Sequence, residues 1–140
     1  MAREWIELGE DTTKAAAAIT KNRFVGFDGL HCGAGKKAYG VSRFDIPINE
    51  YGSIVLGGVV VVESGGAITK GKPVKSDANG KAVEAAAMDG VVDSGAVAVT
   101  SSAANGNILT LNGSEAPEVI NGYAIEAASG AGEFIRILCS

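Results

Sequence analysis

The sequence predicts an all-β fold, a small antiparallel β-barrel or sandwich. Short segments rich in Val, Ile, Phe and Thr recur between glycines or Asp and Asn residues, which is typical of strands separated by tight turns. Hydrophobic residues make up 46% of the chain but aromatic residues only 6%, so the apolar content is mostly small side chains between the turns that 20 glycines provide. A length of 140 residues fits one domain with a single core.

Nine segments are expected to form strands, because each is short, β-branched or aromatic and bounded by turn residues. In chain order they are RFVGF (23–27), AYGVSRF (38–44), SIVLGGVVVVE (53–63), PVKS (73–76), KAVEA (81–85), AVAVT (96–100), NILTL (107–111), EVINGYAI (118–125) and EFIRIL (133–138). Nine strands at this spacing favour an antiparallel barrel or sandwich.

Turn signals lie between these segments. In chain order they are FDG, SGG, DANG, MDG, ANGN and LNG, and each supplies a residue that accepts positive φ. The run from Asp77 to Gly80 is the clearest hairpin signal. The segment TTKAAAAIT (12–20) leaves helix and strand open, since its alanines favour a helix while its threonines and Ile19 favour a strand.

Residues 1–14 are expected to form an N-terminal arm, and residues 15–140 a single β domain. The arm contains Trp5, Ile6 and Leu8 among charged side chains, and it cannot build a core by itself. It therefore either docks on the edge of the barrel or binds a partner. The second alternative makes these three side chains candidate contacts for that partner.

Charge and hydropathy exclude several classes of partner. The formal net charge is −4, the pI is near 5.0, and Lys and Arg do not cluster, so we expect no direct contact with nucleic acid. The longest apolar run, residues 53–62, is shorter than the roughly 20 residues of a membrane span. Charged residues near the N-terminus do not fit a signal peptide, and Cys32 and Cys139 are expected to be reduced, so we expect a chain made in the cytoplasm.

The stretch GAGKKA (33–38) fits the glycine spacing of a dinucleotide-binding loop. Such a loop must open a helix whose amides face the pyrophosphate. Here Tyr39, Val41 and Phe44 alternate with smaller or polar residues, which indicates a strand. The motif is therefore interpreted as a glycine turn between two strands.

No catalytic or metal site is expected. His31 and Cys32 are adjacent, but a metal requires three or four ligands, and neighbouring residues of a strand point to opposite faces. Carboxylates are scattered near turns, without an evident acid and base pair. Lys81 follows a hairpin glycine as in lipoate or biotin carriers, but an ordinary turn explains it. We expect no enzyme activity and no cofactor.

Four motifs in order resemble the capsid cement, or decoration, proteins of tailed bacteriophages. They are RFVGFDG, GAGKKAYGVSRFD, VVVVESGGAITKGKPVKSDANGKAV and NGYAIEAASGAGEFIRIL, and the resemblance covers about residues 20–85 and 119–138. Residues 86–118 depart from it, since they are longer than the family's usual link and contain an extra hairpin of AVAVT and NILTL.

The resemblance implies a homotrimeric β-barrel or β-tulip-like protein that binds the major capsid protein on the outer surface of an expanded capsid, at threefold or quasi-threefold positions. It implies no catalytic residue, no membrane and no nucleic acid. If Trp5, Ile6 and Leu8 contact the capsid, the arm becomes ordered there. The subunit contact is expected to be rich in Val or Ala. The alternative function is a β module on the virion that binds glycans or the host surface.

Overall fold

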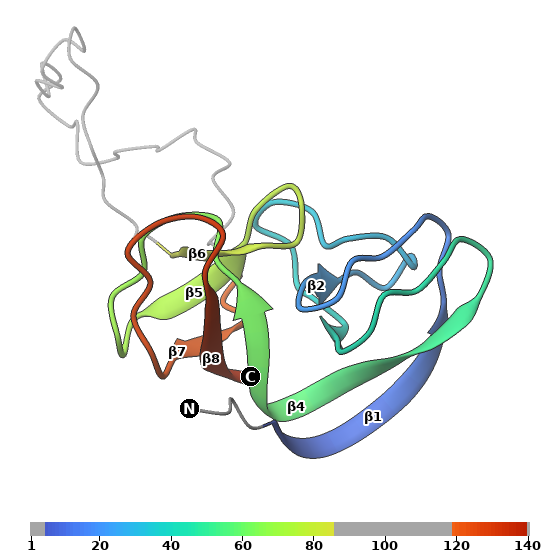
Figure 1. Cartoon of the computed structure of the whole chain (residues 1–140), viewed down its shortest axis with the longest axis horizontal. Coiled ribbons are helices and arrows are strands. Elements are labelled where there is room, and N and C mark those ends of the chain that lie inside the picture. The colour runs from blue at the N-terminus through green and yellow to red at the C-terminus, as the bar shows by residue number, and fades with distance from the viewer. Residues whose placement is uncertain (1–4, 86–118, 140) are drawn as a thin grey trace, which may run out of the picture. The chain divides into compact units, whose positions relative to one another are not determined.

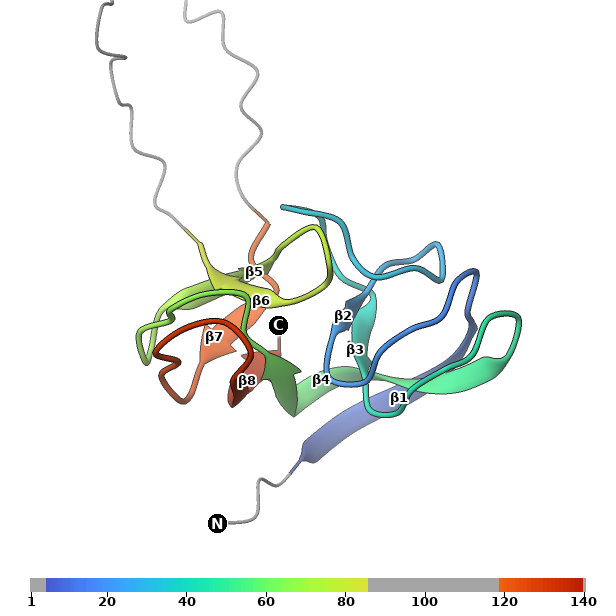
Figure 2. The ribbon, with the colours of Figure 1, turned by 45° about the horizontal axis from the view of Figure 1, so that its top comes forward.

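The computed structural model describes residues 5–85 and 119–139, and in these ranges all regular structure is β. The all-β prediction is confirmed. The strands, labelled in Figures 1 and 2, are β1 (Ile6–Lys14), β2 (Phe24–Val25), β3 (Gly40–Ser42), β4 (Tyr51–Glu63), β5 (Pro73–Ser76), β6 (Ala82–Glu84), β7 (Gly122–Ala124) and β8 (Phe134–Cys139).

The strands form one antiparallel sheet that is barrel-like and nearly closed. Its order is β2-β3-β4-β8-β7-β5-β6, and β1 lies outside this path as a further partner of β4 (Figure 1). The two ends of the path meet, because the amide of Phe24 in β2 donates to the carbonyl of Gly80 in the β5–β6 turn at 2.8 Å. Closure of this kind leaves fewer unpaired sheet edges exposed.

Seven of the nine predicted strand segments correspond to β2 through β8. The predicted strands 96–100 and 107–111 lie outside the described residues. The DANG hairpin is confirmed: β5 pairs with β6, Gly80 has φ +76°, and the Asp77 carboxylate accepts the amides of Asn79 and Lys81. The segment 12–20, for which the sequence allows either a helix or a strand, contains no helix. Its first three residues end β1, and Ile19 forms an isolated bridge with Ile46.

An extended N-terminal arm is not confirmed. Most of residues 1–14 instead form β1, which pairs antiparallel with β4 from Ile6 opposite Val59 to Lys14 opposite Tyr51. The physical reason is that the first half of β4 has a free edge, whose amides and carbonyls are satisfied by a paired strand. The charged residues and Gly9 hide the strand in the sequence because they interrupt apolar alternation.

The core consists of two clusters of mainly aliphatic side chains. The larger contains Phe24, Val60, Val62, Ile135 and Ile137 among others. The buried residues of the smaller cluster are Ala15, Ile19, Val25, Ile46 and Ile54. Strand β4 contributes side chains to both clusters, so it connects the two parts of the core.

A bulge changes the register between β1 and β4 at the glycine pair of β4. The register shifts on either side of Gly9, opposite Gly57 and Gly58. Gly58 has φ +97°, and a Cβ there would overlap the carbonyl oxygen of Ile6, whereas a Cβ at Gly57 would meet no atom within 4 Å. Only glycine fits this backbone at position 58 without strain.

The GAGKKA stretch is a turn held by a residue far away in sequence. Gly35 has φ +67°, and the amide of Lys36 donates to the carbonyl of Gly33 at 3.2 Å. Buried Asn121 accepts the amide of Ala38 at 2.9 Å and donates from Nδ2 to the carbonyl of Lys36 at 3.0 Å. The turn leads into β3, as the strand alternation predicts.

We expect Gly58→Ala to destabilise the fold by about 1–3 kcal/mol, because it forces a positive φ on a residue with a Cβ and displaces β1 from β4. Gly57→Ala is the matched control, and its effect should stay within about 1 kcal/mol. The midpoints of urea unfolding measure both. Equal losses for the two variants would contradict this assignment of the bulge.

Replacing the buried amide should also weaken the fold. We expect Asn121→Ala to lower the free energy of unfolding by about 2 kcal/mol, because the Ala38 amide and the Lys36 carbonyl lose their partner. Exposed Asn79, whose turn contact uses its backbone amide, provides the control Asn79→Ala. If urea unfolding shows no difference between the two variants, Asn121 does not hold the turn.

Candidate functional site

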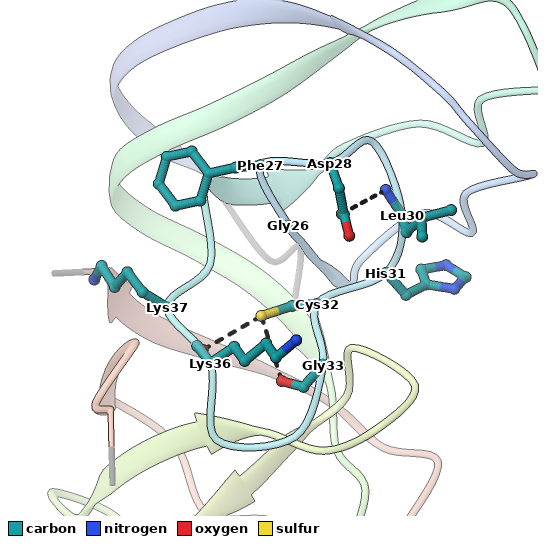
Figure 3. A pocket seen from close by; sticks show the side chains of 9 residues that line it. All are labelled: Gly26, Phe27, Asp28, Leu30, His31, Cys32, Gly33, Lys36 and Lys37. Carbon is teal, nitrogen blue, oxygen red and sulfur yellow. Dashed lines mark hydrogen bonds between the residues drawn. The ribbon is translucent and has the colours of Figure 1, made fainter. Parts of the chain in front are cut away.

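The glycine turn borders a surface pocket of about 390 Å³ (Figure 3). Its lining includes Phe27, Asp28, His31, Cys32 and Lys36. In Figure 3 the His31 ring points away from the Cys32 thiol. His31 and Cys32 are neighbours in the chain and both line the pocket, but their side chains do not point toward each other.

The geometry does not pair Cys32 with His31 as nucleophile and base. The Cys32 thiol donates to the carbonyl of Lys36 at 3.3 Å, and burial raises its pKa, which keeps it protonated. His31 Nε2 accepts the amide of Thr20 at 3.0 Å. Burial, and next the charge of Arg23, lower the pKa of His31, so the imidazole is held neutral. Both side chains act as structural groups here.

The described ranges also contain no site for a dinucleotide phosphate or a metal ion. The GAGKKA turn leads to β3 and not to a helix, so it has no row of helix N-terminal amides for a phosphate. Residues 5–85 and 119–139 contain no group of three His, Cys, Asp or Glu side chains that could hold a metal ion. Cys32 and Cys139 are free thiols, as expected. The described ranges contain no helix, and therefore no helix that is long and apolar enough to cross a membrane.

The three candidate contact residues lie at the start of β1 in two different environments. Trp5 is half-buried and packs against the larger core cluster. The Arg43 guanidinium lies 5.5 Å from the centre of the Trp5 ring and forms an ion pair with Glu7. Ile6 and Leu8 are exposed, at 57% and 80%. Trp5 therefore fixes the beginning of β1, while Ile6 and Leu8 face outward.

Ile6 belongs to a row of apolar side chains that crosses four strands. Ile6 on β1 pairs with Val59 on β4, Val59 with Leu138 on β8, and Leu138 with Tyr123 on β7. Direct partners of an antiparallel pair lie on the same face of a sheet. Leu138 is 50% exposed and Tyr123 45%, and Val59 is half-buried. We call these four residues the outer row.

The sequence alone indicates one end of the outer row, Ile6, and not the other three residues. Alternation in EFIRIL separates Leu138 from the buried Ile135 and Ile137, so the outward position of Leu138 could have been found. The meeting of residues 6, 59, 123 and 138 depends on the register of three strand pairs, and no local pattern specifies that register. An exposed apolar row on a sheet is typical of a surface that binds another protein.

Known structures include one similar to the described fold. It is described as the crystal structure of "head fiber gp8.5 N base in bacteriophage phi29", with a TM-score of 0.60 and 17% sequence identity, covering 94% of this chain and 93% of that chain. At this identity the likeness establishes the fold alone. Curated proteins provide no match to the chain.

The family is established by a separate comparison of the sequence. A family model described as "Phage cement protein" matches residues 8–139. This match begins inside β1, includes the GAGKKA turn and ends at the last residue of β8. It agrees with the resemblance carried by the four sequence motifs. The chain belongs to the phage cement protein family.

Proposed function

We propose that this protein is a decoration protein that binds the outer surface of an expanded phage capsid, as trimers at threefold or quasi-threefold positions, and stabilises the shell. The observation that carries the proposal is the match of residues 8–139 to the cement protein family. Membership of this family makes the chain a structural, capsid-associated component of the virion exterior.

The protein would stabilise the shell by binding its expanded state preferentially and not by catalysing a reaction. A protein that binds the expanded shell more tightly than the unexpanded one favours the expanded state by the difference in binding free energy. The described residues are consistent with such a role, since they offer one continuous sheet and exposed apolar side chains without a nucleophile and base pair. A binding surface is all that this mechanism requires.

Trimerisation would strengthen weak contacts. Three copies present the same patch three times, so once one copy is bound the others bind at a high effective concentration. A contact of modest affinity per copy would then hold the trimer firmly on the shell. The same number of copies suits a threefold position, where three equivalent edges meet.

The capsid contact is proposed to include Trp5, Ile6 and Leu8. They would act from a strand that belongs to the sheet and not from a free arm, because β1 pairs with β4. Trp5 would hold the start of β1 against the core through its packing and the Arg43 contact. Ile6 and Leu8 would supply the apolar contacts. Since β1 pairs only with β4 among the described strands, its second edge is available to a strand of the capsid.

We expect wild-type protein to bind expanded shells saturably in a cosedimentation assay. Leu8→Asp should weaken this binding about 10- to 100-fold, the loss typical of a central interface residue. The fold should be retained, because the Leu8 side chain is 80% exposed. Ile48→Asp is the control, since Ile48 is also exposed, at 56%, but lies outside β1.

Two outcomes would contradict this account at different levels. Wild-type protein that does not bind expanded shells would remove the decoration function. Saturable wild-type binding that Leu8→Asp leaves unchanged would remove β1 from the contact and keep the function.

A further inference from the structure

The pocket beside the GAGKKA turn has the size and the lining of a site for a small ligand. Its volume of about 390 Å³ lies within the range of such sites. Exposed Phe27 and Leu30 supply apolar surface, while Asp28, Lys36 and Lys37 supply charge. Two lysines and one aspartate make this lining net positive, although the whole chain carries −4. A ligand with negative charge therefore suits the pocket.

The Phe27 ring is an exposed aromatic surface that is held in place from behind. Its side chain is 72% exposed, and its ring centre lies 5.1 Å from that of Tyr39. The Tyr39 hydroxyl in turn donates to the carboxylate of Asp11 in β1. In Figure 3 the Phe27 and Lys37 side chains lie on one side of the pocket and Leu30 lies on the other. An aromatic ring that is fixed before binding loses little entropy when a ligand packs on it.

Asp28 and Lys36 line the pocket without neutralising each other. Within the described ranges, neither side chain forms an ion pair. The Asp28 carboxylate accepts the amide of Leu30 at 3.1 Å, and a Cβ at Gly26 would lie 2.8 Å from the same oxygen. The Lys36 stem lies against Gly33, where a Cβ would come within 3.1 Å of its Cδ. Both side chains are therefore positioned, with the Lys36 ammonium left to bind an anion.

The backbone around the pocket is already paired, which disfavours a peptide as the ligand. One edge of β2 pairs with β3. At the other edge Val25 bridges to His31, and the amide of Cys32 donates to the carbonyl of Phe24 at 2.9 Å. An extended peptide gains affinity by adding a strand to a free sheet edge, and β2 offers none here. A compact ligand that brings its own polar groups fits this pocket better.

We propose that this pocket binds an anionic saccharide, a sugar ring that carries a carboxylate or a phosphate. The apolar face of the ring packs on Phe27, the ammonium groups of Lys36 and Lys37 bind the anionic group, and Asp28 accepts a sugar hydroxyl. The inference goes beyond the proposed function and does not require it. On the exterior of a virion, such a pocket would hold the particle on surfaces that display acidic sugars.

An NMR titration of isotope-labelled wild-type protein tests the proposal. The anionic probes are glucuronate and the monophosphate of glucose, and the reference probes are glucose and inorganic phosphate. We expect saturable shifts of amide signals in residues 26–37 with at least one anionic sugar, and a dissociation constant of about 1 mM. Glucose and inorganic phosphate should each bind at least about tenfold more weakly, because one lacks the charge and the other the ring.

Two variants identify the groups that bind. Phe27→Ala and Lys36→Met should each weaken binding of the anionic sugar at least about fivefold. Met keeps the aliphatic contact of Lys36 with Gly33 and removes only the charge. The matched controls are Phe44→Ala and Lys70→Met, because both side chains are exposed and neither lines the pocket. The controls should bind as the wild type does, and the NMR spectrum of each variant shows whether it is folded.

Three results would overturn the proposal. The first is that neither anionic sugar produces a saturable shift in these residues. The second is that folded Phe27→Ala and Lys36→Met bind the sugar as the wild type does. The third is that inorganic phosphate binds as tightly as the anionic sugars, which would leave a contact for an anion alone.

Cosedimentation with expanded shells separates this inference from the proposed function. Sugar binding by a protein that binds no shell would support the pocket and remove the decoration function. Shell binding that Phe27→Ala and Lys36→Met abolish, without any shift by sugars, would overturn the inference and assign the pocket to the capsid contact. Sugar binding that these variants weaken, together with unchanged shell binding, would support the pocket as a second and separate site.

Discussion

Pairing of β4 with three other strands is the interaction on which the rest of the structure depends. β4 has β1 along one edge, while β3 and β8 share the other. It contributes to both core clusters through Ile54 in one and Val60 in the other. Gly58 lets the backbone turn at the junction, which aligns Val59 with Ile6 and Leu138. The outer row exists only because this register is fixed.

The reactive residues of the chain are used for structure. Cys32 and His31 each hydrogen-bond to backbone, and Asn121 fixes a glycine turn that resembles a nucleotide loop in its spacing alone. What the sheet offers to a partner is a surface: exposed Ile6 and Leu8 on β1, and Leu138 and Tyr123 on the neighbouring strands. Polar side chains that hold turns and exposed apolar side chains that can contact a partner are both consistent with a cement protein.

The sequence predicts much of this fold because its local signals are strong. β-branched runs bounded by glycine locate β2 through β8, and the Asp77–Gly80 turn identifies its hairpin. The sequence does not predict β1 as a strand, because an edge strand with little buried surface does not need apolar alternation. The position of Leu138 beside Tyr123 could not be predicted, because it depends on register, which arises from pairing across the whole sheet. Leu8 and Ile6 stand out since large apolar side chains are rare in so polar a segment.

The most direct test of the central claim is the ratio of dissociation constants for expanded capsids and unexpanded procapsids, measured by cosedimentation of the wild-type protein with each. Stabilisation by linkage requires the affinities to differ, because a ligand that binds two states equally shifts neither. Binding should be saturable and much tighter on the expanded shell. Equal affinity for both shells would contradict it, whatever the strength of binding.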